Sequence, residues 1–347
     1  MGEISSYKRD ILNIFKADLP WEKLSGCNIL ITGATGLIGG CLVEALMINP
    51  KRNYQVYASG RNNERAEKRF KEFSCDSGFH FIRYDVTEPL QSNVNFDYII
   101  HAASNGSPNY FALKPVEVMK SNLYGVVNLM EYGLEHGMKR ILYVSSGEIY
   151  GEGDGRSFSE EYSGYVNCIM PRSCYPSSKR AAETLCVSYA EEYGADIVIA
   201  RPCHIYGPDF TEQDNRVYAQ FMRNILRGED IVMKSAGDQY RSWCYVVDCV
   251  SALLYILLKG NSSEAYNIAD PKSNMSIKEL AEMIASIGNK KVIISSPTQE
   301  DGKGFNPVKE SLFSTKRLQR LGWTTNGTMY DKIRFTIDEV KLLKLKS

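Results

Sequence analysis

The stretch NILITGATGLIGGCLVEAL, residues 28–46, decides the fold. It opens with an apolar run typical of a buried parallel strand and continues as a helix. Between the two, Gly33, Gly36 and Gly39 permit a tight turn, close approach of the backbone to a ligand and close packing of helix on strand. The helix N-terminus adds unpaired N–H groups and a positive dipole end. The segment therefore predicts a diphosphate-binding turn, with a purely structural glycine turn as the alternative.

Apolar runs of strand length alternate with helix-length segments from about residue 27 to residue 200. This alternation is typical of an α/β fold with a doubly wound parallel sheet. After Pro202 the alternation weakens, and turn-forming residues gather within 207–215 and 301–307. We therefore expect a Rossmann-type sheet with a smaller, interleaved C-terminal substrate-binding lobe. The expected strands are 28–32, 55–58, 79–84, 98–101, 140–144, 196–200 and 265–269.

The same pattern predicts how the chain is divided. Residues 1–24 are expected to form a short helical extension outside the sheet. Residues 25–203 form the expected dinucleotide-binding domain, to which 240–270 return. Residues 204–239 and 271–347 form the expected substrate-binding lobe.

Composition limits the class of protein. Hydrophobic residues make up 44% of the 347, enough for a substantial core. Lys+Arg and Asp+Glu number 41 each, so no global field favours nucleic acid or an anionic membrane. The longest apolar run, 252–258, is too short to span a bilayer. Nine cysteines without a CxxC pair suit a reducing compartment. We expect a cytoplasmic protein with free thiols and with no nucleic-acid or membrane partner.

The end of the second expected strand, QVYASGRN, bears on cofactor choice. NAD enzymes usually carry an acid here for the ribose 2′-hydroxyl, whereas an arginine accommodates the 2′-phosphate of NADP. Gly60 stands at the acidic position and Arg61 follows, so NADP is favoured over NAD; a solvated loop arginine is the alternative. The residues expected to contact the cofactor are Gly33, Thr35, Gly36, Leu37, Ile38, Gly39, Arg61, Asp85, Val86, Ala102, Ala103, Asn122, Tyr175 and Lys179.

Tyr175 and Lys179 stand four residues apart at the start of a helical segment, so both project from one face. A nearby ammonium stabilises phenolate and lowers a tyrosine pKa from about 10 towards the range of a general base. Ser145 and Ser146 end the fifth expected strand, at the sheet edge where doubly wound folds bind ligands. The sequence predicts that Ser146 holds a reacting hydroxyl while Tyr175 takes its proton. A turn-capping serine is the alternative.

Three further side chains are candidates. Glu148 is expected to act as an acid or base or to bind a substrate hydroxyl, with a salt-bridged glutamate as the alternative. The fork of Arg241 suits a substrate diphosphate, with an ion pair to Asp238 or Asp248 as the alternative. His204 lacks partners at metal-ligand spacing, so no metal site is expected.

With these residues in place, the chain resembles the extended short-chain dehydrogenase/reductase family, in particular its NAD(P)-dependent nucleotide-sugar epimerases and dehydratases. The resemblance covers nearly the whole chain and rests on GATGLIGG, HAAS, KSNLYGVVNLM, SSGEIYG, YPSSK, RPCHIYGP and RSWCYVVDC, in the family's order. Within the family, SPNYFALKP, YVNCIMPRSCYPSSKRAAETLC and RSWCYV look most like UDP-glucuronate decarboxylases.

The resemblance implies an enzyme that modifies a nucleotide-diphosphate sugar by oxidation and reduction at C4. It also implies a homodimer paired through helices around 116–136 and 175–193. The implied catalytic residues are Ser146, Glu148, Tyr175 and Lys179, and the residues expected to contact the substrate are Ser107, Ser146, His204 and Arg241.

Three residues, Gly60, Gly147 and His204, depart from the family's pattern. Similar 4,6-dehydratases often carry an aspartate where Gly147 stands, to protonate the departing C6 hydroxyl. Decarboxylation needs less help, because oxidising C4 of a glucuronate places a ketone β to the carboxylate. A UDP-glucuronate decarboxylase is therefore the leading interpretation. The alternatives are an NADPH-dependent reductase of a nucleotide-linked 4-keto-6-deoxysugar, favoured by Arg61, a 4-epimerase or 4,6-dehydratase, and a non-catalytic dinucleotide sensor.

Overall fold

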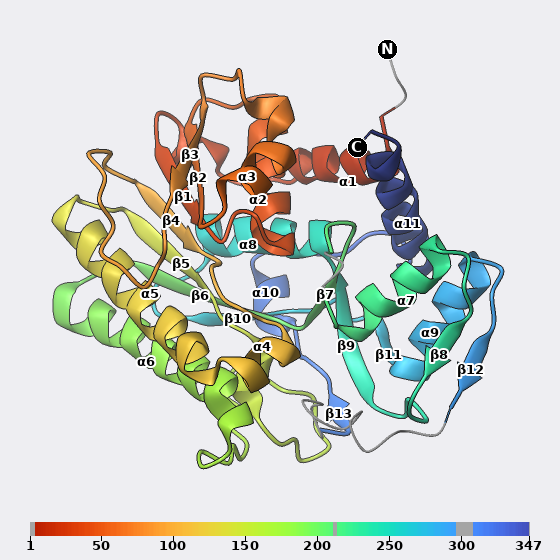
Figure 1. The fold of residues 1–347 in the computed structure, drawn as a ribbon. Coiled ribbons are helices and arrows are strands. Elements are labelled where there is room, and N and C mark those ends of the chain that lie inside the picture. The colour runs from red at the N-terminus through yellow and green to blue at the C-terminus, as the bar shows by residue number, and fades with distance from the viewer. Residues whose placement is uncertain (1–3, 211–213, 296–307, 347) are drawn as a thin grey trace.

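The computed structural model describes residues 4–210, 214–295 and 308–346, and it is built around one seven-stranded parallel sheet (Figure 1). The strand order is β10-β6-β5-β4-β1-β2-β3, so the direction of winding reverses between β1 and β4. Doubly wound folds bind ligands in the crevice at that reversal. Each strand lies within two residues of its expected bounds: β1 (Asn28–Thr32), β2 (Gln55–Gly60), β3 (Phe79–Arg83), β4 (Tyr98–His101), β5 (Arg140–Val144), β6 (Ile197–Pro202) and β10 (Ala265–Ile268).

Helices cover both faces of this sheet because its strands are apolar on both sides. Side chains of a strand alternate between faces, and accordingly Ile29 and Ile31 belong to one buried cluster while Leu30 belongs to the other. The first face packs against α2 (Leu37–Ile48) and α8 (Val246–Lys259). The second packs against α5 (Pro115–Glu135) and α6 (Cys174–Tyr193), which lie side by side. Two shorter helices, α3 (Asn63–Arg69) and α4 (Pro108–Leu113), complete this part.

A smaller lobe lies beyond the carboxyl ends of the strands (Figure 1). Its centre is β9 (Tyr240–Tyr245), which pairs with β7 (His204–Tyr206), β11 (Asn274–Ser276) and β13 (Glu310–Ser311). After β9 the chain returns to the large sheet through α8 and β10, so the two parts are interleaved. The lobe also holds β8 (Ile231–Met233), β12 (Val292–Ile294), α7 (Val217–Leu226), α9 (Ile277–Ile287) and α11 (Met329–Lys346), whereas α10 (Lys316–Arg320) packs against β10 and α8 of the large sheet.

The N-terminal segment forms α1 (Ser6–Asn13), outside the sheet as expected. The Ser5 side chain caps it by accepting a hydrogen bond from the Lys8 N–H, and Tyr7 and Ile11 are buried. α1 packs against α2, α8 and α11. In the described part of the chain, no helix has the length and apolar character needed to cross a membrane. All nine cysteines are free thiols, as predicted.

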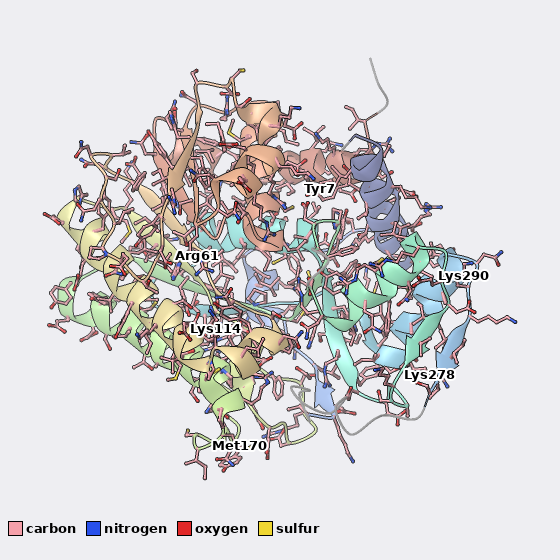
Figure 2. All side chains as sticks on the ribbon, in the orientation of Figure 1. Tyr7, Arg61, Lys114, Met170, Lys278 and Lys290 are labelled. Atoms are coloured by element: carbon pink, nitrogen blue, oxygen red, sulfur yellow. The ribbon has the colours of Figure 1, made fainter. Side chains whose placement is uncertain are left out.

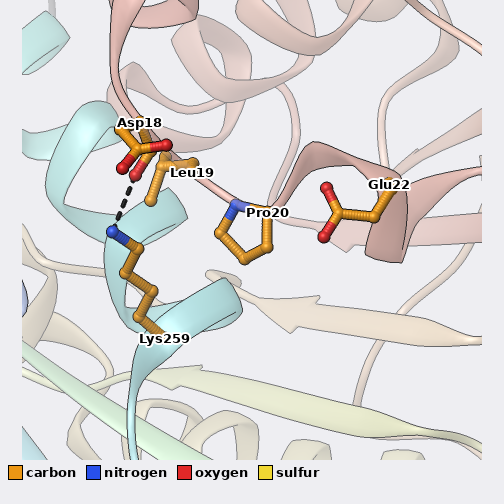
Figure 3. Close-up of a pocket in the computed structure, with 5 residues that line it drawn as sticks. All are labelled: Asp18, Leu19, Pro20, Glu22 and Lys259. Carbon is orange, nitrogen blue, oxygen red and sulfur yellow. Dashed lines mark hydrogen bonds between the residues drawn. The ribbon is translucent and has the colours of Figure 1, made fainter.

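A pocket of about 310 Å³ lies beside this N-terminal segment (Figure 3). Lys259 closes one side by donating to the Asp18 carbonyl at 2.7 Å. Helix α8 starts at the carboxyl edge of the sheet and runs antiparallel to the strands, and Lys259 is its last residue. The pocket beside Lys259 therefore lies at the amino edge of the sheet. It is therefore remote from the crevice where the predicted site residues gather. Its lining residues are Asp18, Leu19, Pro20, Glu22 and Lys259.

Candidate active site

The glycine turn between β1 and α2 is shaped by backbone contacts that exclude side chains. Gly33 has a φ of +68°, and a Cβ there would lie 2.6 Å from the Ala102 carbonyl oxygen at the end of β4. A Cβ on Gly39 would lie 2.4 Å from the Gly33 oxygen. No described side chain caps α2 at Gly36, so its first N–H groups remain available to an anion. The turn fits a dinucleotide diphosphate.

The end of β2 lies next to this turn. A Cβ on Gly60 would be 3.5 Å from the Thr35 hydroxyl, so the two segments are adjacent. Arg61 follows β2 directly, and its guanidinium lies 3.7 Å from the Asp85 carboxylate (Figure 2). Their side chains are 60% and 40% exposed, so both are available to a ligand. They also line a pocket of about 290 Å³ that extends to Lys120 and Tyr124 on α5.

Polar residues behind the crevice form a buried chain of hydrogen bonds. His101 is buried and its Nδ1 lies 2.7 Å from the Thr32 hydroxyl. Burial, reinforced by the charge of Lys179, lowers the His101 pKa to about 3, which favours a neutral ring. Asn122 accepts from the Ser104 hydroxyl at 2.8 Å and donates to Ser178 at 2.9 Å. Asn122 thereby joins α5 to the catalytic helix α6.

Tyr175 and Lys179 are both buried on α6. The Lys179 ammonium donates to the Val144 carbonyl at 2.9 Å and lies 5.8 Å from the Tyr175 ring. Burial lowers the pKa of Lys179 to about 7. Burial also raises the pKa of Tyr175 to about 12, although hydrogen bonds with the Ser146 and Ser104 hydroxyls lower it. The prediction that Lys179 brings the Tyr175 pKa below 10 is therefore wrong for the chain alone, because the sequence does not reveal the extent of burial.

Ser146 caps a turn, which was the alternative given for it. Its hydroxyl accepts from the Glu148 N–H at 3.2 Å and so caps the short 3-10 helix Gly147–Tyr150. The same hydroxyl lies close enough to Tyr175 to lower the pKa of its phenol. The local turn therefore fixes the serine next to the tyrosine.

Glu148 is ion-paired, which was the alternative given for it. Both of its oxygens accept hydrogen bonds of 2.9 Å from Arg172. The Arg172 guanidinium lies 4.7 Å from the ring centre of Phe111, and that ring stacks on Tyr175 at 4.5 Å. Sequence analysis missed Arg172 and Phe111. The position of Arg172, three residues before Tyr175, was a usable signal, whereas nothing local marks Phe111.

Loop residues of the lobe reach the site from the other side. The Ser107 hydroxyl donates to the Asn215 side chain at 3.0 Å. The neighbouring Arg216 forms a two-pronged ion pair with Asp214, and its charge favours the ionised form of Tyr175. Arg216 was also missed, because its role depends on how the loop folds back.

The same loop is tied to the cofactor side. Asp209 accepts a 2.5 Å hydrogen bond from Arg69 at the end of α3. The Arg69 guanidinium in turn lies over Gly40 of α2, where a Cβ would come within 1.9 Å of it. Asp209 thus connects the loop that leads to Arg216 with the helix that starts at the glycine turn.

Arg241 and His204 lie on neighbouring strands of the lobe. Arg241 is buried, and its guanidinium donates to the carbonyls of Lys309, at 2.9 Å, and Val308, at 2.5 Å. Burial lowers its pKa to about 10 against the opposing charge of Glu148. His204 is exposed, with its ring 5.2 Å from Trp243. Within the described ranges, no three His, Cys, Asp or Glu side chains are placed to hold a metal ion.

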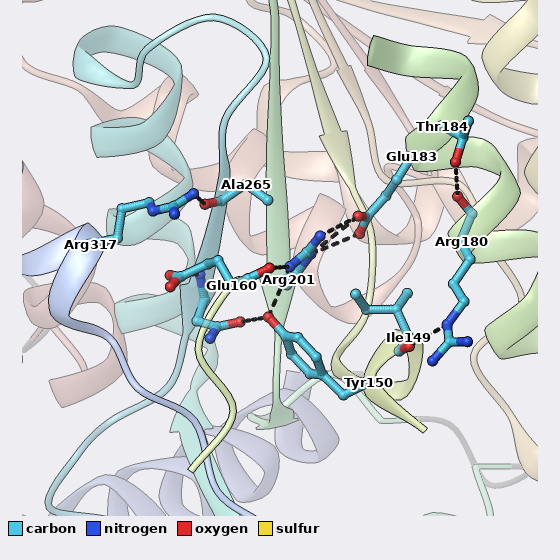
Figure 4. A network of polar contacts seen from close by, with 10 residues as sticks. Ile149, Tyr150, Glu160, Arg180, Glu183, Thr184, Arg201, Ala265 and Arg317 are labelled. Atoms are coloured by element: carbon cyan, nitrogen blue, oxygen red, sulfur yellow. Dashed lines mark hydrogen bonds and ion pairs between the residues drawn. The ribbon is translucent and has the colours of Figure 1, made fainter. Parts of the chain in front are cut away.

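A buried network centred on Arg201 of β6 supports the site from below (Figure 4). Arg201 donates to Glu183 of α6 at 2.6 Å and to the Tyr150 hydroxyl at 3.1 Å. Tyr150 donates in turn to Asn267 of β10 at 2.6 Å. Buried charges need such complete pairing, because an unpaired one is strongly destabilising. The network fixes the 3-10 helix that follows Ser146 relative to the helix that carries Tyr175.

Comparisons with known proteins agree with this geometry. Residues 29–269 match the model of the "NAD dependent epimerase/dehydratase family". The chain is 36% identical over 301 residues to UDP-glucuronic acid decarboxylase 5 of Arabidopsis thaliana, covering 86% of this chain and 85% of the relative. It is 32% identical to UDP-glucuronic acid decarboxylase 1 of Xenopus tropicalis, covering 85% and 68%.

Solved structures share the fold. The UDP-glucuronic acid 4-epimerase of Bacillus cereus aligns with a TM-score of 0.78 at 22% identity, over 91% of this chain and 99% of that one. The dTDP-glucose 4,6-dehydratase DesIV of Streptomyces venezuelae aligns with a TM-score of 0.78 at 21% identity, over 91% and 97%. The expected Rossmann-type fold is therefore confirmed.

Proposed function

The chain belongs to the NAD dependent epimerase/dehydratase family, and we propose that within this family it is a UDP-glucuronate decarboxylase. The observation that carries the proposal is the placement of the buried Tyr175 and Lys179 on α6, with the Lys179 ammonium 5.8 Å from the Tyr175 ring and bonded to the last residue of β5, at the sheet edge that also holds the glycine turn. The identity to decarboxylases over most of the chain directs the choice of substrate.

The residues present fit a nicotinamide dinucleotide. The Gly33–Gly39 turn is held tight by backbone contacts that a Cβ would break, and no described side chain caps α2, so its first N–H groups are available to a diphosphate. A bound oxidised nicotinamide would supply a hydride acceptor and a positive charge that favours phenolate at Tyr175. We propose that the diphosphate is held by Gly33, Thr35, Gly36, Leu37, Ile38 and Gly39, and the remainder of the cofactor by Arg61, Asp85, Val86, Ala102, Ala103, Asn122, Tyr175 and Lys179.

In the proposed reaction, Ser146 holds the C4 hydroxyl and Tyr175 removes its proton as C4 is oxidised to a ketone. The C5–C6 bond then breaks. Its electron pair moves onto the C4 carbonyl oxygen, CO₂ leaves, and C5 takes up a proton. The hydride that was removed from C4 in the oxidation then returns to C4, and Tyr175 gives its proton back to the C4 oxygen. The product is therefore a UDP-pentose, and no net reductant is consumed.

Arginines on the lobe side suit the anionic groups of this substrate. We assign the diphosphate to Arg241, whose hydrogen bonds in the described chain go to carbonyl oxygens, with Ser107 and His204 nearby in the lobe-facing wall. Arg216 lies close enough to Tyr175 to affect its ionisation, so it suits a carboxylate held near the reacting carbons.

The test is incubation with UDP-glucuronate and a catalytic amount of cofactor, followed by mass spectrometry. The proposal expects CO₂ and a UDP-pentose or its 4-keto precursor, without stoichiometric consumption of NADPH. The second candidate is a reductase of a nucleotide-linked 4-keto-6-deoxysugar, favoured by the exposed Arg61 beside the cofactor turn. It gains support if UDP-glucuronate is inert and such a sugar oxidises NADPH mole for mole.

Four finer assignments belong to the same proposal. Arg61 favours NADP over NAD. Exposed apolar side chains on α5 and α6, including Val116, Tyr124 and Tyr193, support a homodimer, which light scattering would test. Free thiols throughout support a cytoplasmic location. Residues 25–203, with α8 and β10, carry the cofactor, while 204–239 and 271–347 carry the sugar.

A further inference from the structure

Gly147 stands between two candidate catalytic side chains, Ser146 and Glu148, and it has no space for a side chain of its own. It is buried in the first turn of the 3-10 helix that Ser146 caps. A Cβ built on Gly147 would lie 2.0 Å from Cζ and 2.5 Å from Cε1 of Phe313. Real Cβ contacts are never that short, so the Phe313 ring occupies the volume that residue 147 would otherwise fill.

Phe313 is held in that place from several directions. Its ring is 6% exposed and packs edge-on against Tyr150 at 5.6 Å and Phe158 at 5.8 Å. Its backbone N–H donates to the Ser242 hydroxyl of β9 at 3.1 Å. The Phe158 N–H donates to the Leu312 carbonyl at 2.7 Å, which pins the adjoining residue. Moving the ring would therefore disturb a packed aromatic cluster and two segments of backbone.

We propose that Phe313 determines the specificity of the reaction by excluding a proton-donating side chain from position 147, an inference that rests on the proposed function. Loss of a hydroxyl from C6 requires a proton delivered to the departing oxygen. Loss of CO₂ from C6 requires none, because the C5–C6 electron pair moves to the C4 carbonyl and CO₂ leaves as a neutral molecule. A site without a proton donor at position 147 therefore supports loss of a C6 carboxylate as CO₂ but does not support elimination of a C6 hydroxyl.

The neighbouring groups do not replace the missing donor. Both oxygens of Glu148 accept hydrogen bonds from Arg172, so the side chain is turned towards that guanidinium. Ser146 is engaged with Tyr175 and with the Glu148 N–H. The combination of Gly147 and Phe313 therefore keeps a proton donor away from this side of the site.

The steric part is tested by a double-mutant cycle of Gly147→Ser, Phe313→Ala and the double variant. Gly147→Ser alone should reduce CO₂ release from UDP-glucuronate about a hundredfold, through displacement of Ser146 and Glu148. Adding Phe313→Ala should recover at least about tenfold of that loss. Phe158→Ala is the matched control, since it removes a ring from the same cluster without opening space at residue 147. The inference would be overturned if the effects of Gly147→Ser and Phe313→Ala on CO₂ release were additive. It would also be overturned if Phe158→Ala restored the activity of Gly147→Ser as well as Phe313→Ala does.

The specificity part is tested by Gly147→Asp combined with Phe313→Ala. The wild type should form no 4-keto-6-deoxysugar from UDP-glucose, whereas the double variant should form it measurably and lose CO₂ release by at least about tenfold. An unchanged product ratio in a double variant that melts cooperatively and still binds cofactor would contradict the inference. A wild type that releases no CO₂ refutes the proposed function instead, and the melting temperatures of the Gly147→Ser cycle then still decide whether Phe313 excludes a side chain.

Discussion

The two sides of the crevice are built differently. On the cofactor side, the turn from Gly33 to Gly39 is one continuous stretch, shaped by its own backbone and by its contact with Ala102 at the end of β4. On the substrate side, contacts join segments far apart in the chain, such as Ser107 with Asn215 and Gly147 with Phe313. The comparison teaches that cofactor binding is encoded locally, whereas substrate choice depends on how the lobe packs onto the sheet.

The largest effect on turnover is expected from Tyr175→Phe, which removes the proposed catalytic base and leaves the glycine turn intact. Removing the phenolic hydroxyl should slow turnover of UDP-glucuronate by about 10²–10⁴, because general acid–base catalysis at C4 is lost. Cofactor affinity, measured by fluorescence titration, should fall by no more than about tenfold, since Tyr175 is one of many proposed contacts and the glycine turn is untouched. Tyr189→Phe on the same helix is the control and should behave as wild type. Near wild-type turnover of Tyr175→Phe would remove Tyr175 from the mechanism.

A side chain added to the glycine turn should weaken cofactor binding without any change on the substrate side. Gly33→Ala forces a Cβ to 2.6 Å from the Ala102 oxygen at a φ of +68°, which should cost about 2–4 kcal/mol in cofactor binding or folding. Gly155→Ala is the matched control, because Gly155 has a φ of +87° but nothing within 4 Å of its Cβ position. Thermal melting with and without cofactor distinguishes the two. Equal effects of both variants would mean that the close approach at Ala102 is unimportant.

The choice between the two nicotinamide cofactors should depend on Arg61. A charge-assisted hydrogen bond to the 2′-phosphate contributes about 1.5–3 kcal/mol, so Arg61→Ala should erase most of a tenfold or larger preference for NADP. Lys68→Ala, an exposed change on α3, serves as control. Identical titration curves for NAD and NADP on the wild type would refute this assignment.

The smallest expected effect concerns the connection between the two sides. Asp209→Asn weakens the bond to Arg69 and should raise KM for the nucleotide sugar about threefold to tenfold, since a partly exposed ion pair contributes about 1 kcal/mol. The kcat should change little, because Tyr175 and Ser146 keep their places. Asp76→Asn breaks a comparable pair with Arg52 that is remote from the lobe. A KM change of the same size in both variants would indicate general destabilisation.

The difference between the two sides also explains what the sequence predicted. The strands, the turn and the group of Ser146, Tyr175 and Lys179 follow from short motifs, and the sheet brings their ends together. The rise in the Tyr175 pKa could not be predicted, because it depends on burial by Phe111 and neighbouring segments.

The missed residues share one property: their partners lie elsewhere in the chain. Arg172 matters because it pairs with Glu148, and Phe313 matters because its ring covers Gly147. Neither contact leaves a periodic pattern or a fixed spacing in the sequence. A single sequence therefore reveals the short motifs that bind the cofactor and carry the acid–base residues. It does not reveal the long-range contacts that surround the substrate.

The packing of α1 against α11 has a consequence for how the molecule withstands damage. The first and last described helices pack against each other, and each contributes buried apolar residues, Tyr7 and Ile11 on α1 and Ile337 and Val340 on α11. Local unfolding or proteolysis of either helix would therefore expose apolar residues of the other. The two helices should then become susceptible to proteases together. This shared seam lies away from the crevice, which leaves the reacting groups insulated from early unfolding at the ends of the chain.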